Sequence, residues 1–287
     1  LKIGYVRAIK SFIYHFYINF QVEYKMKTMT FLTDFGSKSS YVAQMKAVAL
    51  NLTDARIVDI THEINPQNII EGAFILKTTV PYFPRGTVHV AVVDPGVGTK
   101  RRGIVIATPS QILVGPDNGL MIPAAKRLGN FQVYEIKNKN LMMNNISNTF
   151  HGRDIFTPVA SHILNGTYFN EIGPKIDDYK TLDLGSFTVN DKTVEGKILF
   201  IDGFGNIITN INGLKIRNYF DFGKKIMVFI GKKRIEIPFV KTYDEIKKGK
   251  TLATIGSSNL LEISINQGNA SEKYKIKTGE SIKILFS

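Results

Sequence analysis

Apolar residues follow two different patterns along the chain, and the change comes near residue 185. Before it, apolar runs at 29–32, 56–60 and 88–93 alternate with stretches in which apolar residues recur at helical spacing. These stretches contain Tyr41, Met45, Val48 and Leu52, and then Ile69, Ala73, Leu76 and Val80. Continuous apolar strands that alternate with helices are typical of a sheet buried on both faces. We therefore predict an N-terminal α/β domain with a mostly parallel sheet.

The second pattern consists of short strand-like segments separated by turn residues. The segments are 197–201, 207–211, 225–230, 234–239, 260–265 and 281–286. One helix is indicated, at 243–248. This predicts a smaller, mostly antiparallel β domain. The polar stretch 177–191 is the expected linker, so we divide the chain into domains 29–180 and 181–287.

Residues 1–28 differ from the rest of the chain in charge and hydropathy. They carry five basic residues against one acidic residue, and an apolar aromatic run at 11–20. The run is too short to span a bilayer, and no small-residue cleavage site follows it. We interpret residues 1–28 as an extension and expect no membrane partner, with a membrane-surface or export segment as the alternative.

Composition excludes fewer classes of function than the motifs do. The net charge of +13 raises the possibility of nucleic-acid binding, but beyond residue 28 the basic residues are scattered among acidic ones and accompany no known recognition motif. We expect no nucleic-acid partner. The chain has no cysteine, which excludes disulfides, zinc–thiolate sites and a cysteine nucleophile. A reducing, cytoplasmic location fits this composition.

Two loops place a carboxylate directly after a predicted strand. Asp34 lies in the segment Thr-Asp-Phe-Gly at 33–36, and Asp94 begins the segment Asp-Pro-Gly-Val-Gly-Thr at 94–99, which Lys100, Arg101 and Arg102 follow. Ligands of α/β domains bind at the carboxyl ends of the strands. The kinase glycine-rich and His-Arg-Asp loops are absent, and the glycine spacing does not match a phosphate loop. A turn or a helix cap is the structural alternative for both carboxylates.

Three further segments carry chemistry-bearing residues. His151, in Phe-His-Gly-Arg-Asp at 150–154, is able to exchange hydrogen bonds with water at neutral pH, whereas Asp154 and Arg153 suit a helix cap and an ion pair. The segment Asp-Ile-Thr-His-Glu at 59–63 lacks the paired-histidine spacing of metalloproteases, so a metallohydrolase stays an alternative. The segment Asp-Gly-Phe-Gly-Asn at 202–206 offers a ring to stack on a base, or else forms a tight hairpin.

These segments in this order, together with Gly-Pro-Asp-Asn-Gly at 115–119, resemble the S-adenosyl-L-methionine hydrolase family, also called SAM hydroxide adenosyltransferases, which are related to fluorinase and chlorinase. The resemblance covers residues 29–287. It implies an α/β domain followed by a β-barrel-like domain. It also implies a homotrimer whose active sites lie between neighbouring subunits, and hydrolysis of S-adenosyl-L-methionine to adenosine and methionine with no metal and no cofactor.

The resemblance also implies roles for individual residues. The water-activating carboxylate, arginine and histidine fall on Asp94, Arg101 and His151, with Arg102 as the rival for the arginine; Arg101 and His151 orient the water, and Asp94 fixes them and accepts its proton. The remaining positions bind substrate: Asp34 for the ribose diol, Asp202, Phe204 and Asn206 for adenine and methionine, and Ser257, Ser258, Glu262 and Ala270 for further contacts.

Two competing functions remain after this comparison. The halogenases carry a serine at the halide, and the corresponding position here is Gly152, which argues against 5′-halo-adenosine synthesis. A non-catalytic sensor of adenosine or S-adenosylmethionine would bind tightly without turnover. Product analysis distinguishes all three.

Overall fold

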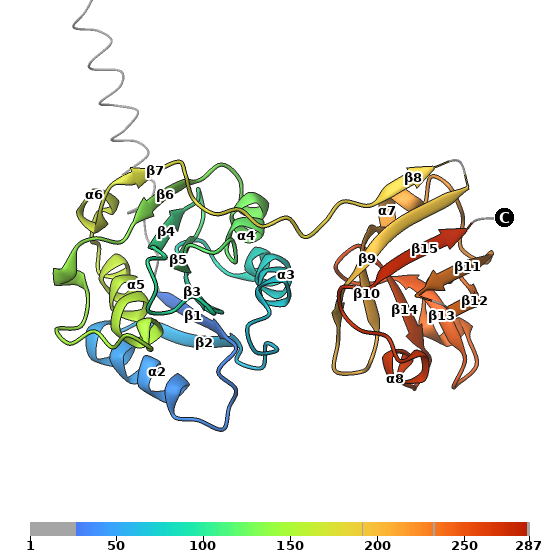
Figure 1. Ribbon diagram of the computed structural model, residues 1–287, viewed down its shortest axis with the longest axis horizontal. Helices are drawn as coiled ribbons and strands as arrows, with labels where there is room; N and C mark the ends of the chain where they lie inside the picture. The colour runs from blue at the N-terminus through green and yellow to red at the C-terminus, as the bar shows by residue number, and fades with distance from the viewer. Residues whose placement is uncertain (1–26, 191, 232, 286–287) are drawn as a thin grey trace, which may run out of the picture. The chain divides into compact units, whose positions relative to one another are not determined.

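The computed structural model describes residues 27–190, 192–231 and 233–285, which fall into two units divided between Leu182 and Asp183 (Figure 1). The extension expected at 1–28 lies outside these residues except for its last two positions. Within the described segments, no helix is long and apolar enough to cross a membrane.

The apolar runs of the first unit form one sheet with the strand order β2-β1-β3-β5-β4-β6-β7. Pairing is parallel from β2 to β5 and antiparallel from β5 to β7, so the parallel pairing that we expected belongs to one half of the sheet. Its strands are β1 (Thr28–Thr33), β2 (Arg56–Thr61), β3 (Val88–Val92), β4 (Gly103–Ala107), β5 (Ile112–Pro116), β6 (Gln132–Glu135) and β7 (Lys175–Ile176).

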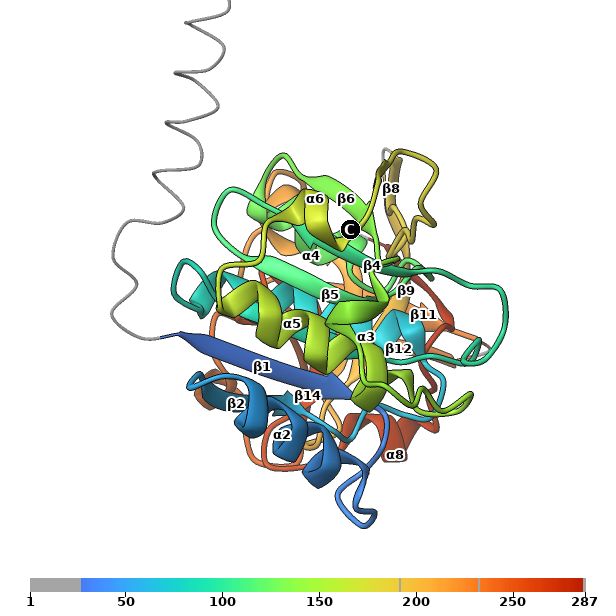
Figure 2. The same cartoon turned by 90° about the vertical axis from the view of Figure 1, so that its left-hand side faces the viewer.

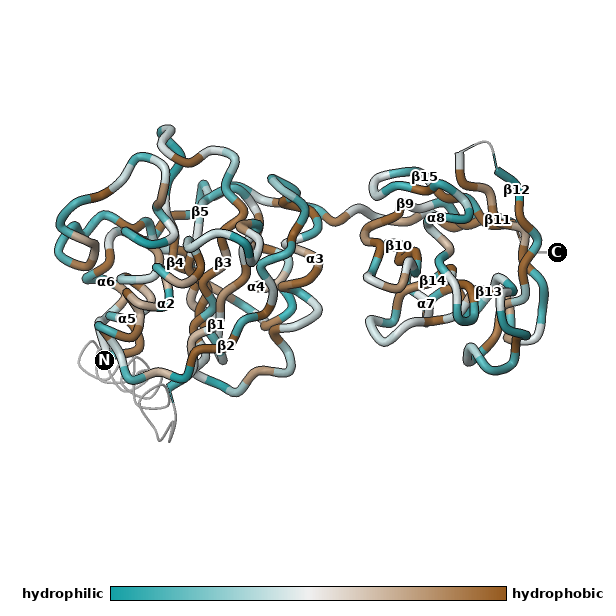
Figure 3. Tube along the Cα trace, turned by 90° about the horizontal axis from the view of Figure 1, so that it is seen from below, coloured by the Kyte–Doolittle hydropathy of each residue, from teal (hydrophilic) through white to brown (hydrophobic). Residues whose placement is uncertain are grey.

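Helices cover both faces of this sheet. Figures 1 and 2 show α2 and α5 on one face and α3 and α4 on the other. Strands β1, β3, β4 and β5 between them are predominantly hydrophobic (Figure 3), and β3 is buried along its whole length. The α-helices are α2 (Tyr41–Leu52), α3 (Ile69–Thr79), α4 (Ile122–Leu128), α5 (Thr157–Leu164) and α6 (Phe169–Ile172), with a π-helical turn η3 (Gly152–Phe156) and 3-10 turns η1 (Val80–Tyr82) and η2 (Lys139–Leu141).

The second unit is an antiparallel sheet that curls into a nearly closed barrel. Its strand order is β12-β11-β15-β9-β10-β14-β13, β8 pairs with β9, and a bridge between Phe239 and Ala253 joins the two ends. The strands are β8 (Thr188–Asn190), β9 (Thr193–Ile201), β10 (Ile207–Asn212), β11 (Lys225–Ile230), β12 (Lys233–Pro238), β13 (Thr251–Ile255), β14 (Leu260–Ile265) and β15 (Ser281–Leu285).

Helical segments of the second unit differ from the sequence expectation. The expected helix at 243–248 is only the 3-10 turn η4 (Tyr243–Glu245), because a capping box between Thr242 and Glu245 satisfies the backbone of a single turn and extended chain follows at Ile246. Two short helices were not expected, α7 (Gly213–Ile216) and α8 (Ala270–Tyr274), each capped by the asparagine that precedes it. Strands β8 and β13 were also not expected, and β8 falls within the stretch 177–191 that the sequence indicated as linker.

A buried histidine makes the stability of the first unit depend on pH. His89 on β3 is bonded through Nδ1 to Thr30 at 2.7 Å and through Nε2 to Gln111 at 3.0 Å, and burial lowers its pKa to about 4. The unfolded chain therefore binds a proton below pH 6.5 that the folded chain does not, and stability that is complete above pH 6.5 is lost as the pH falls towards 4.

We expect the free energy of unfolding to fall by about 3 kcal/mol more in the wild type than in His89→Gln between pH 7 and pH 4. Urea unfolding of both proteins at several pH values measures the difference. Equal losses in the two proteins would show that His89 does not cause this pH dependence.

Candidate functional site

Arg101 joins Asp94 and His151 into one hydrogen-bonded group. Its Nε donates to both carboxylate oxygens of Asp94 at 2.9 Å, and its Nη2 donates to Asp94 Oδ2 at 2.5 Å and to His151 Nδ1 at 2.7 Å. The side chains of Asp94 and Arg101 are only 5% and 10% exposed, and the guanidinium packs on the ring of Phe156. Asp94 and His151 are 57 positions apart in the sequence. The fold brings them into contact with Arg101.

The local fold explains how each member reaches this group. Asp94 follows β3 at the carboxyl end of the parallel half of the sheet, and the turn 94–99 returns the chain so that Arg101 faces it. Gly98 has φ +76°, and a Cβ there would lie 2.5 Å from the carbonyl oxygen of Asn148, so the turn packs directly on the segment that leads to His151. The glycine is therefore required by both conformation and space.

The electrostatics of the group keep His151 neutral. Burial lowers the pKa of its imidazole, and the adjacent positive charge of Arg101 lowers it further. A guanidinium only donates hydrogen bonds, so His151 Nδ1 accepts. The proton of the neutral ring therefore lies on Nε2, which leaves a ring N–H as a donor.

Arg102 has a different role and is not the arginine of this group. It donates from Nε to the buried carboxylate of Asp117 at 2.9 Å and from Nη1 to Asp178 at 2.7 Å. Asp117 also accepts a hydrogen bond from the backbone of Lys180. Arg102 thus fixes the residues just before Leu182, where the first unit ends.

Asp34 follows β1, the neighbour of β3 in the sheet, so the two carboxylates leave adjacent parallel strands at the same edge. Its Oδ2 accepts a hydrogen bond from the backbone of Gln67 at 2.8 Å, and Gln67 has φ +64°. The buried carboxylate of Glu71 accepts hydrogen bonds from Asn65 and Asn68 and so holds the same loop. The sequence did not indicate that Gln67 contacts Asp34. Its left-handed conformation depends on the hydrogen bonds that Asp34 and Glu71 accept from this loop.

The residues next to His151 are structural. Arg153 donates to the buried carboxylate of Asp154 at 2.6 Å, as the ion-pair interpretation predicts, and Asp154 also accepts from the backbone of Ser147. Gly152 is buried, and a Cβ on it would lie 3.2 Å from the Met45 sulfur. A serine at this position would be crowded by α2.

The segment considered for a metal does not gather a ligand set. His62 is bonded to Thr33 through Nδ1 at 2.9 Å, its Nε2 lies 3.1 Å from Asp59, and Asp59 pairs with Lys46. Across the part of the chain that the structure describes, no three His, Cys, Asp or Glu side chains come together in a way that could hold a metal ion.

In the second unit, the segment 202–206 forms a tight turn between β9 and β10. Asp202 Oδ1 accepts hydrogen bonds from the backbones of Phe204 and Asn206, and Oδ2 accepts from the Asn206 side chain, all at 2.9 Å. Phe204 at the tip is 80% exposed. The turn therefore exposes the Phe204 ring to solvent, and the Asp202 carboxylate fixes the backbone of the turn.

Glu262 on β14 lies near this turn and has a partner that the sequence did not identify. Tyr243 of η4 donates its hydroxyl to Glu262 Oε1, and Ser264 donates to the same oxygen at 2.7 Å. Burial, together with the hydrogen bond to Glu262, raises the pKa of Tyr243 to about 12, and the charge of Asp202 contributes. Tyr243 was missed because nothing within 243–248 marks a tyrosine as functional.

The last expected contacts lie around these groups. Ser257 and Ser258 are exposed in the turn between β13 and β14, where Gly256 adjoins Glu262. Ala270 begins α8, whose Ser271 donates a backbone hydrogen bond to the carbonyl of Gly205. The turn 202–206 and the start of α8 are therefore bonded to each other within the second unit.

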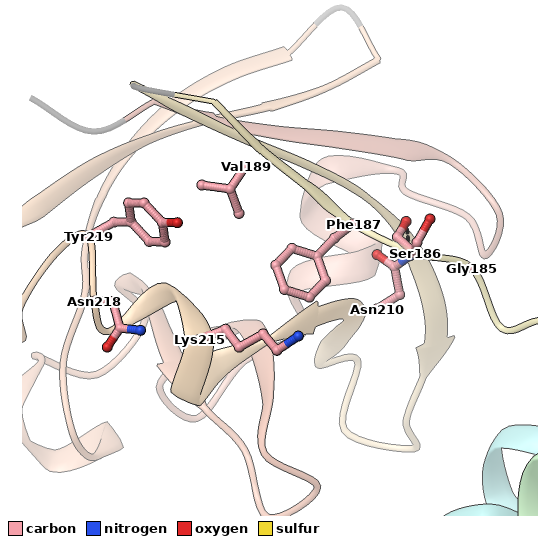
Figure 4. A pocket seen from close by; sticks show the side chains of 8 residues that line it. All are labelled: Gly185, Ser186, Phe187, Val189, Asn210, Lys215, Asn218 and Tyr219. Atoms are coloured by element: carbon pink, nitrogen blue, oxygen red, sulfur yellow. Dashed lines mark hydrogen bonds between the residues drawn. The ribbon is translucent and has the colours of Figure 1, made fainter. Parts of the chain in front are cut away.

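A separate groove of about 600 Å³ in the second unit contains none of the expected site residues. Phe187 and Val189 line one side, and Lys215 and Tyr219 line the other (Figure 4). Lys215 runs beneath the ring of Phe187, with its ammonium 5.9 Å from the ring centre. The charged residue of its lining, Lys215, already lies by the Phe187 ring. The groove therefore indicates no catalytic site.

Comparison with known proteins identifies both units. Residues 29–173 match the model of the SAM hydroxide adenosyltransferase N-terminal domain, and residues 196–283 match that of the C-terminal domain. The chain is 38% identical over 269 residues to an (R)-S-adenosyl-L-methionine hydrolase of Methanocaldococcus jannaschii, covering 90% of this chain and 95% of the relative.

More distant relatives include a fluorinase of Actinoplanes sp., 24% identical over 89% of this chain and 96% of the relative. A crystal structure of an uncharacterised conserved protein from Thermotoga maritima superimposes with a TM-score of 0.86 at 37% identity, covering 90% of this chain and all of that one. The hydrolase is the more similar of the two named enzymes.

Proposed function

The chain belongs to the SAM hydroxide adenosyltransferase family, and we propose that it hydrolyses S-adenosyl-L-methionine to adenosine and L-methionine at Asp94, Arg101 and His151. The observation that carries this proposal is the single guanidinium that binds a buried carboxylate and a neutral imidazole at the carboxyl end of β3. The fluorinase relative is less similar, and the crowded Gly152 disfavours a halide-binding serine.

The reaction is a displacement at C5′ of the ribose. A water oxygen forms the new bond to C5′ while the C5′–S bond breaks and its electron pair passes to sulfur. Methionine leaves as a neutral thioether, so the leaving group needs no acid, and one proton is released. The task of the protein is to hold the water in line and to favour its hydroxide form, and positioning alone is worth several kcal/mol.

Arg101 and His151 suit this task because both present N–H donors. The Nε2–H of His151 and the Nη1 group of Arg101 donate to the attacking oxygen and stabilise negative charge as it develops. Asp94 already accepts three hydrogen bonds from Arg101. Its part is therefore to fix the guanidinium, and the proton of the water passes to solvent rather than to Asp94.

Substrate binding divides between the two units. Asp34 binds the ribose diol, and the turn 202–206 stacks Phe204 on adenine, with Asn206, Ser257, Ser258, Glu262 and Ala270 nearby in the second unit. We propose a cytoplasmic homotrimer in which each site combines the first unit of one subunit with the second unit of the next. No metal and no cofactor take part.

The direct test is incubation of the purified protein with S-adenosyl-L-methionine, with and without EDTA and with chloride varied, followed by chromatography of the products. Release of adenosine and methionine that resists EDTA is the expected result. A halogenated nucleoside would place the protein with the halogenases, and tight binding of intact substrate would make it a sensor.

A further inference from the structure

The loop that carries Asp94 and Arg101 is fixed at its carboxyl end by the sheet. Strands β4 and β5 pair antiparallel, and the backbone N–H of Asp117, which follows β5, donates to the carbonyl of Arg102, which precedes β4, at 2.9 Å. The side chains of Asp117 and Arg102 form an ion pair at the same place. This end of the loop is therefore attached to β5 by both backbone and side-chain contacts.

On the side that faces β5, the amino end of the same loop is held by the side chain of Asn118. The register between β3 and β5 ends at Val90 of β3, and the chain continues beyond it to Asp94. The Nδ2 group of Asn118 donates to the carbonyl of Val93 at 2.8 Å, and its Oδ1 accepts from the backbone N–H of Leu120 at 3.1 Å. One amide thus joins the end of β3 to the loop after β5.

The close approach of the two strands explains why a short amide does this. A Cβ on Gly115 would lie 2.3 Å from the carbonyl oxygen of Ala91, so β5 passes very near β3 and brings the residues after it within reach. An asparagine side chain offers a donor for Val93 and an acceptor for Leu120 on one planar group. Attachment at two points restricts its rotation, so the carbonyl that precedes Asp94 is held in one direction.

We propose that Asn118 is a positioning residue for the reaction and acts on it through Asp94; the inference rests on the proposed function. Asn118 holds the peptide group between Val93 and Asp94, and rotation of this group would turn the Asp94 side chain. Asp94 in turn accepts three hydrogen bonds from Arg101, and Arg101 donates to His151. A displacement at Val93 is therefore passed to all three groups that act on the water.

Single-turnover hydrolysis of S-adenosyl-L-methionine in a double-mutant cycle tests the proposal. We expect Asn118→Ala to lower the rate about 30-fold in the wild type but less than about threefold in Asp94→Asn, because a residue that acts through Asp94 has little effect once that carboxylate is lost. KM should change less than about twofold. A purely structural loss would reduce the rate by the same factor in both backgrounds, and that result would overturn the proposal.

Asn138→Ala is the matched control. Asn138 makes the same two hydrogen bonds, from Nδ2 to the carbonyl of Glu171 at 2.9 Å and from the backbone N–H of Asn140 to Oδ1 at 3.0 Å. It is partly buried in the first unit, as Asn118 is, but it attaches the chain to α6 instead of to the end of β3. The control should keep its rate within about twofold of the wild type. Equal losses in the two variants would contradict a specific role for Asn118.

The titration of His151 makes the test independent of turnover. Burial and the charge of Arg101 lower the pKa of its imidazole, whereas the carboxylates of Asp94 and Asp154 raise it. If Asn118→Ala turns the guanidinium away from the ring, the pKa of His151 measured by NMR should rise, and it should stay at the wild-type value in the control variant. An unchanged pKa in Asn118→Ala would show that the asparagine does not position this group.

The two measurements separate the proposal from the function on which it rests. If the wild type does not hydrolyse the substrate but His151 responds as expected, the proposed function fails and the positioning role stands. If the wild type hydrolyses the substrate and either measurement fails, the positioning role fails and the function stands. Asn118→Ser replaces Asn118→Ala if that variant does not fold, because its hydroxyl can still accept from Leu120 but does not reach Val93.

Discussion

Asp94→Asn is expected to lower kcat for S-adenosyl-L-methionine hydrolysis about 1,000-fold in a protein that remains folded. The carboxylate accepts three hydrogen bonds from Arg101, and an amide offers fewer acceptors and turns an N–H₂ donor towards a guanidinium. Arg101 would then lose the orientation in which it contacts His151. Because the group acts on the attacking water, kcat should fall much more than KM rises.

The matched control for this variant is Asp178→Asn. Asp178 also pairs with an arginine, Arg102, but its side chain is 78% exposed. We expect activity within about twofold of the wild type, since exposed ion pairs contribute little. Single-turnover rates and circular dichroism of both variants make the comparison. Retention of near wild-type kcat by Asp94→Asn would refute the role given to the Asp94–Arg101–His151 group.

Gly205→Ala is expected to reduce kcat/KM about 100-fold by displacing the turn 202–206. Gly205 has φ +81°, where an L-residue costs about 1–2 kcal/mol, and its Cβ would lie 1.9 Å from the side-chain oxygen of Asn269. The turn and α8 would have to separate, because Asn269 is the cap of α8. Phe204 would move with the turn, and substrate binding would weaken.

Gly223→Ala separates backbone strain from this clash. Gly223 has φ +87°, nearly the same conformation, but no atom lies within 4 Å of the Cβ position. It should lose about 1–2 kcal/mol of stability and keep its activity. Thermal unfolding and kinetics on both variants measure the two effects. Equal losses of activity in Gly205→Ala and Gly223→Ala would show that strain alone, rather than contact with Asn269, sets the effect.

Local sequence patterns predicted most of the elements that position the site. The strand over 88–92 was predicted from a continuous apolar run, because it is buried along its whole length. The helices over 41–52 and 69–79 were predicted from helical spacing of apolar residues, because part of each helix surface is buried. The expected helix at 243–248 was wrong because three residues with a capping box satisfy their own hydrogen bonds locally. Helices α7 and α8 are too short to carry a periodic signal.

The sequence by itself determined the α/β and β character of the two halves, the order of the segments that show the family, and the residue types available for chemistry. It left Arg101 and Arg102 equivalent, because two adjacent arginines have the same local pattern. Only the tertiary structure assigned Arg101 to Asp94 and Arg102 to Asp117. It likewise paired Tyr243 with Glu262. These pairs are 7, 15 and 19 positions apart in the sequence, and each forms because a turn or a neighbouring strand brings the chain back past itself. Local patterning carries no information about which side chains then meet.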